Sequence, residues 1–180
     1  ELLKEHEAPI QERVEALRKR LYEQPYAESL FDERGQFKTG HQELSPEVAA
    51  AQAGYVRRYT EFFPPGALRG LRLLAYQHSA VGRDLLVEIL EQLGARVIPA
   101  GRSETFVPID TENIGTEQLE TIQALVDQAG AVDAVVSTDG DSDRPLLLGV
   151  ERGRVRFFGG DLVGMVAAEF LGADAVVVPI

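Results

Sequence analysis

The sequence predicts an α/β fold of three layers, in which helices cover both faces of a mixed, mostly parallel sheet. Short apolar runs alternate with amphipathic helical patterns from residue 71 onward, as in parallel strands joined by crossover helices. Glycine follows two of the helical patterns, at Gly94 and Gly130, where helices commonly end. Hydrophobic residues make up 44% of the 180 residues, so the chain can bury a core of this kind.

Two helices are expected before the sheet begins. Residues 1–44 are polar and irregular, with one helical pattern at 9–21 and a turn at 31–37 between two short extended pieces. A second helix should begin at Ser45-Pro46-Glu47, because serine is a good N-cap, proline suits the first helical position and glutamate suits the positive helix end. Pro64-Pro65-Gly66 should end this helix. Its apolar residues share one face: Val48, Tyr55, Tyr59 and Phe62.

The remaining elements follow from apolar runs and helical spacing. Strands are expected at residues 71–76, 96–99, 134–137, 146–150 and 175–178, and helices at 82–93, 116–129 and 161–171. Residues 154–158 should pair with 146–150 through the Glu151-Arg152-Gly153 turn. Ligands of open parallel sheets bind at the carboxyl ends of the strands, so functional residues are expected in the loops that follow them.

Composition excludes several function classes. The chain has 29 acidic and 18 basic residues and a net charge of -11, which argues against a nucleic-acid partner, because phosphate neutralisation needs a surplus of Lys and Arg. It has no cysteine, which rules out disulfides and thiolate metal sites and fits a cytoplasmic location. No apolar run is long enough to span a bilayer, so no membrane partner is expected. The chain starts at Glu1 and ends at Ile180 after an apolar run, and we expect it to be a piece of a longer protein.

The informative segment is Asp139-Gly140-Asp141-Ser142-Asp143-Arg144, which follows the expected buried strand at 134–137. Its three carboxylates, on Asp139, Asp141 and Asp143, alternate over five residues and can converge on a hard cation that prefers oxygen ligands. Without a cation they would repel one another and raise each other's pKa. Arg144 keeps its charge and can bind a phosphate through two N–H groups.

Two other structural interpretations fit this segment less well. Asp-rich turns are often merely solvated, but the position after a strand, the strict alternation and the arginine argue against that reading. A calcium loop of the EF-hand kind fails at two positions, because its sixth residue should be Gly but is Arg144, and its twelfth should be Glu but is Val150. A non-catalytic Rossmann-like module, in which the aspartates form a structural calcium site, stays open as the alternative function.

The segment 139–144 resembles the metal-binding loop of the α-D-phosphohexomutases, the family of the phosphomannomutases and phosphoglucomutases. In that family the loop ends a strand of the second of four domains, and Ser142 stands where many members have glycine. Residues 73–82 resemble the strand and turn that open this domain, 55–59 fall at its leading helix, and 160–163 resemble the start of the third domain.

The resemblance implies a domain division and a mechanism. Residues 1–44 would be the end of domain one with a linker, 45–158 domain two, and 159–180 the start of domain three. The parent enzyme would interconvert hexose 1-phosphate and hexose 6-phosphate through a phosphoserine and a bisphosphate intermediate. Mg²⁺ would be held by Asp139, Asp141 and Asp143, and Arg144 would be a catalytic residue on the phosphate side.

Several of the family's functional segments are missing. No Thr/Ser-Ala-Ser-His-Asn-Pro loop, which would carry the catalytic serine, occurs in the sequence, and neither does the sugar-recognising Gly-Glu-x-Ser-Gly loop. We interpret His78 and Ser79 as turn residues and Lys38 as a surface residue. The resemblance therefore predicts that this chain has no mutase activity by itself.

Overall fold

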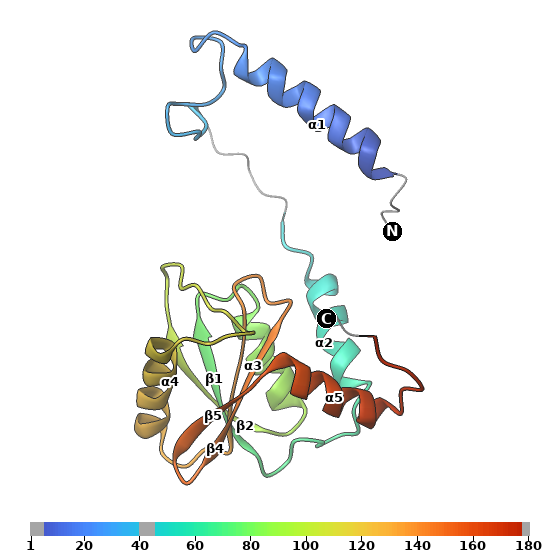
Figure 1. Cartoon of the computed structure of the whole chain (residues 1–180), viewed down its shortest axis with the longest axis vertical. Coiled ribbons are helices and arrows are strands. Elements are labelled where there is room, and N and C mark those ends of the chain that lie inside the picture. The colour runs from blue at the N-terminus through green and yellow to red at the C-terminus, as the bar shows by residue number, and fades with distance from the viewer. Residues whose placement is uncertain (1–5, 40–45, 178–180) are drawn as a thin grey trace. The chain divides into compact units, whose positions relative to one another are not determined.

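Two units make up the chain, Glu1–Glu47 and Val48–Ile180, and each is described by itself. The computed structural model describes residues 6–39 and 46–177 (Figure 1). In the first unit, α1 (Glu7–Tyr22) confirms the first predicted helix and has no buried residue. The predicted turn is also confirmed, because Phe31 and Phe37 form an antiparallel bridge across it.

A five-stranded sheet in the order β2-β1-β3-β4-β5 lies at the centre of the second unit. β1 is parallel to both β2 and β3, whereas β4 is antiparallel to β3 and β5 is antiparallel to β4. The mixed sheet is confirmed, although parallel pairing makes up half of it rather than most of it. Six residues, 139–144, separate β3 from β4, and a parallel return needs about a dozen or more. The strands are β1 (Arg72–His78), β2 (Arg96–Arg102), β3 (Ala134–Thr138), β4 (Pro145–Glu151) and β5 (Arg154–Phe158).

Helices lie on both faces of the sheet, which confirms the three layers (Figure 1). α3 (Arg83–Gln92) packs against β1, β2 and β3, and α4 (Thr116–Ala129) packs against β1, β2 and β5. β2 and β3 are the two neighbours of β1 in the sheet, so the connection from β1 to β2 and the connection from β2 to β3 run in opposite directions across the sheet. Right-handed crossovers in these two directions place α3 and α4 on opposite faces. The strand order reverses at β1, and a crevice at the carboxyl ends of the strands at such a point is a common ligand site.

The main core lies between the sheet and α4. Leu74 of β1, Ile122 of α4 and Leu148 of β4 are all 0% exposed and belong to one apolar cluster. A smaller cluster joins α2 (Ala49–Thr60) to α3 through Val56, Ile89 and Leu93. These two clusters fix the sheet between its helices and so hold the loops at its carboxyl edge.

The second helix begins later than predicted and turns a different face inward. α2 starts at Ala49, the first of three alanines, which are the strongest helix formers; the three residues before it are not helical, and Ser45 lies outside the described residues. Val56 is 3% exposed, whereas Tyr55 and Phe62 are 43% and 61% exposed. Of the predicted face, Tyr59 is half-buried against the cluster with α3, whereas Tyr55 and Phe62 are exposed. Contact with α3, rather than the count of aromatic residues, decides which side of α2 is buried.

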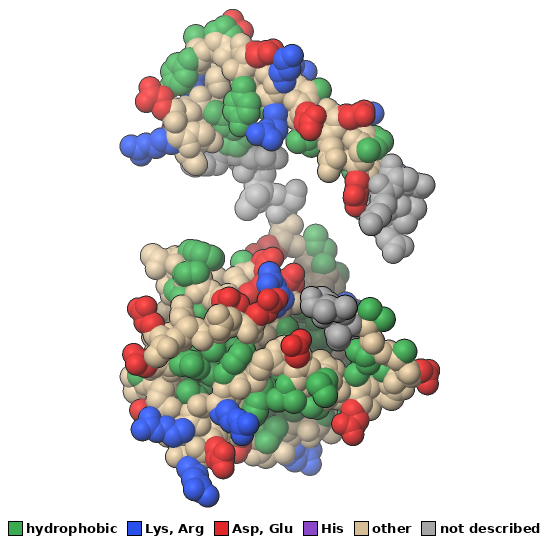
Figure 2. Space-filling model, viewed as in Figure 1, with side chains coloured by type: hydrophobic (Ala, Val, Ile, Leu, Met, Phe, Trp, Pro, Cys, Tyr) green, Lys and Arg blue, Asp and Glu red, His purple; other side chains and the backbone are tan. Residues whose placement is uncertain are grey.

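The last predicted strand is not formed in the described part of the chain. After α5 (Gly160–Leu171), residues 175–177 have no regular structure, and Val178 lies outside the described residues. A strand is held by hydrogen bonds to a neighbour, and no described strand pairs with this segment. Apolar side chains are visible on the surface of the second unit (Figure 2), and α5 exposes five of them: Leu162, Met165, Val166, Phe170 and Leu171. Across residues 6–39 and 46–177, no helix has both the length and the apolar character needed to cross a bilayer.

Candidate metal centre

Residues 139–144, here called the aspartate loop, join β3 to β4 at the carboxyl end of β3. The loop is closed at its base by a hydrogen bond from the N–H of Asp139 to the carbonyl oxygen of Arg144, at 3.1 Å. The Asp139 Oδ1 atom accepts two further hydrogen bonds, from the N–H of Asp143 at 3.1 Å and from the N–H of Arg144 at 3.2 Å. Asp139 is 7% exposed, so the folded loop fixes its carboxylate before any ligand binds.

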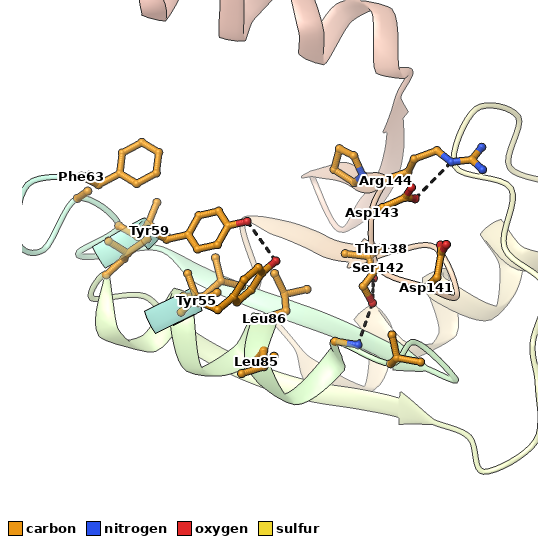
Figure 3. A pocket seen from close by; sticks show the side chains of 18 residues that line it. Tyr55, Tyr59, Phe63, Leu85, Leu86, Thr138, Asp141, Ser142, Asp143 and Arg144 are labelled. Carbon is orange, nitrogen blue, oxygen red and sulfur yellow. Dashed lines mark hydrogen bonds and ion pairs between the residues drawn. The ribbon is translucent and has the colours of Figure 1, made fainter. Parts of the chain in front are cut away.

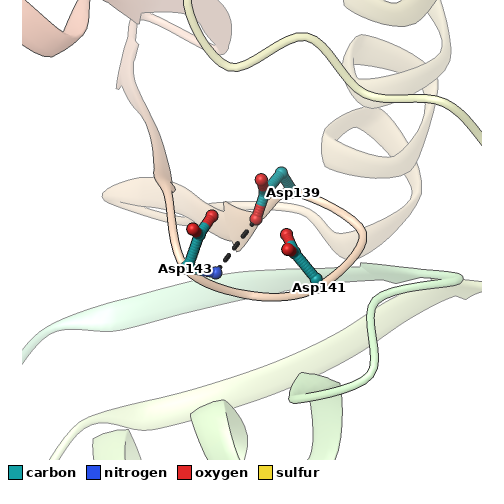
Figure 4. A group of neighbouring side chains, drawn as sticks. All are labelled: Asp139, Asp141 and Asp143. Atoms are coloured by element: carbon teal, nitrogen blue, oxygen red, sulfur yellow. Dashed lines mark hydrogen bonds between the residues drawn. The ribbon is translucent and has the colours of Figure 1, made fainter. Parts of the chain in front are cut away.

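The three predicted carboxylates are brought together. One oxygen from each of Asp139, Asp141 and Asp143 lies within 4.8 Å of the other two (Figure 4). Opposite ligands of Mg²⁺ lie about 4.2 Å apart and those of Ca²⁺ about 5 Å apart. The 4.8 Å limit lies within the separation of opposite Ca²⁺ ligands and slightly above that of opposite Mg²⁺ ligands. The donor set of three carboxylates fits either hard cation better than a soft metal.

Asp139 and Asp141 differ in how easily they ionise. Burial opposes ionisation of Asp139, but hydrogen bonds from the N–H of Arg144 and from its loop neighbours outweigh burial and hold its pKa below the ordinary value. The pKa of Asp141 is raised, first by the negative charge of Asp139 and then by that of Asp143. Asp139 is therefore ionised more readily than Asp141. A nearby cation would favour the charged form of Asp141 by offsetting the negative charges of its neighbours.

The aspartate loop is attached to the turn between β1 and α3. The N–H of Val81 donates to the carbonyl oxygen of Gly140 at 3.0 Å, and the N–H of Gly82 donates to Ser142 Oγ at 2.8 Å (Figure 3). The Thr138 hydroxyl lies 3.1 Å from the same oxygen. Sequence reasoning treated Ser142 only as a tolerated replacement of glycine. Its contact with Gly82 crosses 60 residues of chain, and no local pattern could have shown it.

Arg144 lies at the exposed end of the loop, among three carboxylates. Its Nε atom lies 3.4 Å from Asp139 Oδ2 and 3.6 Å from Asp143 Oδ1, and its Nη1 atom lies 3.6 Å from Glu112 Oε1. The side chain is 59% exposed. Glu112, in the segment before α4, was missed by sequence reasoning, because nothing in the local sequence links it to the aspartate loop.

A mostly apolar hollow of about 690 Å³ runs from the aspartate loop along α2 and α3 (Figure 3). Tyr55 and Tyr59 line it on the α2 side, with their hydroxyl oxygens 3.1 Å apart. Asp141, Ser142 and Asp143 lie at its other end. The charged groups of the hollow therefore lie in the loop, and the tyrosine hydroxyls add polar groups on the α2 side.

Comparison with known proteins decides the family. The domain family described as phosphoglucomutase/phosphomannomutase, alpha/beta/alpha domain II, matches residues 53–152. The chain belongs to the phosphoglucomutase/phosphomannomutase family. It is 44% identical over 126 residues to a phosphomannomutase of Sinorhizobium fredii (strain NBRC 101917 / NGR234), a match that covers 70% of this chain and 26% of the relative.

Two other relatives cover similar parts of the chain. A phosphomannomutase of Salmonella muenchen is 37% identical over 139 residues, which is 77% of this chain and 28% of the relative. A phosphoglucosamine mutase of Neisseria gonorrhoeae (strain ATCC 700825 / FA 1090) is 33% identical over 115 residues, which is 61% of this chain and 25% of the relative. The chain therefore spans about a quarter of the length of these family members.

The structure also places three residues that the sequence analysis assigned no catalytic function. His78 is 0% exposed and its Nε2 lies 2.8 Å from the carbonyl oxygen of Thr138. Ser79 lies in the turn after β1, where its hydroxyl oxygen accepts a hydrogen bond from the N–H of Val107 at 2.8 Å. Lys38 is exposed and donates to the carbonyl oxygen of Tyr26. The interpretations of Ser79 as a turn residue and of Lys38 as a surface residue agree with these positions, whereas His78 is the last residue of β1 and pairs with Arg102 of β2.

The buried His78 ring predicts that stability depends on pH. Because a carbonyl accepts from Nε2, the neutral ring carries its proton there, and the buried Nδ1 has no hydrogen-bond partner. Burial lowers the pKa of His78 below 6.5. The hydrogen bond to the Thr138 carbonyl opposes this shift. The positive charge of Arg83 lowers the pKa further, and the negative charge of Asp139 raises it. The unfolded chain therefore binds a proton that the folded chain resists, so the free energy of unfolding should fall as the pH drops below about 6.5.

Urea unfolding at pH 7.5 and pH 5.5 checks this expectation. The His78→Asn variant lacks the titrating ring, so its free energy of unfolding should change less between these two pH values than that of the natural chain. Equal changes in the two proteins would contradict the assignment to His78.

Proposed function

We propose that the chain is the domain II part of a Mg²⁺-dependent phosphohexomutase, of the phosphomannomutase/phosphoglucomutase type. The complete enzyme interconverts hexose 1-phosphate and hexose 6-phosphate through a phosphoserine and a bisphosphate intermediate. The convergence of three carboxylates in the aspartate loop, within a family-matched domain, is the observation that carries the proposal. Two relatives are named phosphomannomutases, which favours that substrate class.

The proposal includes a division of the chain. Residues 1–44 are the end of domain one with a linker, 45–158 are domain two, and 159–180 begin domain three. Two observations support the first boundary and the position of the second domain. The sequence boundary between the two compact units falls between Glu47 and Val48, and the family match at 53–152 lies inside the proposed second domain.

Asp139, Asp141 and Asp143 are the proposed ligands of Mg²⁺. When bound, the ion offsets the negative charge of the phosphoryl group during its transfer. Asp139 is held by two backbone N–H groups, so it presents a fixed oxygen. Asp141 and Asp143 are exposed, so their side chains can adjust to the geometry that Mg²⁺ requires.

Arg144 is the proposed phosphate-binding residue. Its three carboxylate partners lie at 3.4 to 3.6 Å, whereas strong charge-assisted hydrogen bonds are about 2.8 Å long. Exposed ion pairs of this length are weak, so the guanidinium can leave Glu112 and turn two N–H groups toward a substrate phosphate.

The test of this proposal is the Arg144→Ala variant of the complete enzyme. We expect mutase activity to fall by more than about 100-fold, which corresponds to the loss of an electrostatic contact to the transferring group. The midpoint of thermal unfolding should stay within a few degrees of the natural enzyme, because the side chain is 59% exposed. If the aspartate loop is instead a structural calcium site, Arg144→Ala will leave activity unchanged, and Ca²⁺ will raise the unfolding midpoint more than Mg²⁺ does.

The 180-residue chain alone should show no mutase turnover. The sequence contains no Thr/Ser-Ala-Ser-His-Asn-Pro run of the kind that would carry the phosphoserine, and the proposed transfer requires that group as phosphate donor and acceptor. A coupled assay with mannose 1-phosphate or glucose 1-phosphate and a trace of the bisphosphate checks this expectation. Measurable conversion above that of a heat-inactivated sample would contradict it.

A further inference from the structure

Ser142 has a backbone conformation that its residue type disfavours. Its φ is +67°, in the left-handed region that residues other than Gly, Asn and Asp seldom occupy. The residue is nevertheless firmly attached, since its Oγ accepts a hydrogen bond from the N–H of Gly82 at 2.8 Å and lies 3.1 Å from the Thr138 hydroxyl oxygen. The side chain therefore supplies contacts that a glycine at this position would lack.

Gly82 meets Ser142 from the other side. A Cβ atom added at Gly82 would lie 2.9 Å from both Cβ and Oγ of Ser142, and it would meet no other atom within 4 Å. The φ of Gly82 is -89°, which any residue can adopt. It is therefore the Ser142 side chain, and not the backbone, that excludes a side chain at position 82.

The contacts of Gly140 and Ser142 lie on both sides of Asp141. The carbonyl oxygen of Gly140 accepts from the N–H of Val81, and the hydroxyl oxygen of Ser142 accepts from the N–H of Gly82. Both donors belong to the turn that leads into α3. Asp141 is exposed, so these two flanking contacts restrain its backbone where burial does not.

We propose that Ser142 is a positioning residue which, together with Gly82, holds Asp141 in place for metal binding. This inference rests on the proposed function, because it assumes that the aspartate loop binds Mg²⁺. It adds to the three ligands two residues that do not touch the metal. The Ser142 hydroxyl and the absence of a side chain at Gly82 keep Asp141 correctly placed.

The first experiment removes the hydroxyl. Ser142→Ala keeps the left-handed residue but leaves the Gly82 N–H without its acceptor. Mg²⁺ affinity of the 180-residue chain, measured by isothermal titration, should fall about three- to tenfold, the usual effect of one hydrogen bond. The control is Ser103→Ala, which removes a hydroxyl that bonds only within its own loop, to Thr105. Its Mg²⁺ affinity should match that of the natural chain, and urea unfolding without metal verifies that both variants fold.

The second experiment tests whether positions 82 and 142 act as a pair. Gly82→Ala should weaken Mg²⁺ binding when Ser142 is present, because the new Cβ collides with its side chain. The same Gly82→Ala change made in a Ser142→Gly protein should alter Mg²⁺ affinity by less than about twofold, since its two close contacts are gone. A merely structural function would change the unfolding midpoint and leave the affinity of the folded protein unaltered.

The outcomes separate this inference from the proposed function. If the natural chain binds Mg²⁺ and Ser142→Ala binds it equally well, or if Gly82→Ala has the same effect in both backgrounds, the positioning inference is overturned and the metal site stands. If the natural chain shows no Mg²⁺ binding, the proposed metal site fails and the inference fails with it.

Discussion

Asp139→Asn is expected to abolish Mg²⁺ binding by the 180-residue chain, or to weaken it by more than about 100-fold. Loss of an outer contact to a metal ligand costs about 10- to 100-fold in affinity, and Asp139 is proposed as a ligand itself. It also organises the other two, since its Oδ1 accepts from the N–H groups of Asp143 and Arg144. An amide at this position is neutral, so it loses the attraction to the cation while keeping nearly the same volume.

Isothermal titration with Mg²⁺ measures this effect. Asp141→Asn should also weaken binding, but by less, because its carboxylate is exposed and makes fewer contacts within the loop. Asp110→Asn is the matched control; its carboxylate accepts from the N–H groups of Glu112 and Asn113 and lies outside the three-carboxylate cluster. Equal heats for the natural chain and Asp139→Asn would reject the aspartate loop as a metal site.

Leu74→Ala is expected to have the largest effect on stability. Leu74 is 0% exposed, lies in β1 between β2 and β3, and belongs to the cluster between the sheet and α4. Truncation of such a side chain removes its buried surface and leaves a cavity, and it lowers the free energy of unfolding by about 2–5 kcal/mol. Urea unfolding followed by circular dichroism gives the value.

Leu162→Ala makes the same chemical change at an exposed position and serves as the control. Leu162 in α5 is 47% exposed, so its truncation should change the free energy of unfolding by less than about 0.5 kcal/mol. Similar losses in Leu74→Ala and Leu162→Ala would mean that β1 is not at the centre of the core, and the sheet order would have to be revised.

Local sequence was enough for the elements that carry their own signals. The bounds of α4 at Thr116–Ala129 and of β5 at Arg154–Phe158 agree with the prediction residue for residue. Both are delimited by turn residues, at Gly130 and at Gly153, which have positive φ. The aspartate loop was found for the same reason, since its alternating carboxylates are contiguous in sequence.

Features that depend on distant parts of the chain were not predicted. The buried face of α2 is set by Ile89 of α3 and by Leu93, which directly follows that helix, and no pattern within α2 reveals this. The partnership of Arg144 with Glu112 is likewise formed only when the loop before α4 folds back toward β3. Sequence reasoning also overestimated parallel pairing, because it did not use the short length of the aspartate loop, which forces β4 to run antiparallel.

The contact between Ser142 and Gly82 has an evolutionary consequence. With this backbone, the two positions cannot both carry a full side chain, because a Cβ at 82 would lie 2.9 Å from two atoms of Ser142. Starting from this sequence, a change of position 142 to glycine would first remove both close contacts and make room for a side chain at position 82. In the opposite order, the intermediate protein would carry a steric clash next to Asp141, so sterics favour the order in which position 142 changes first.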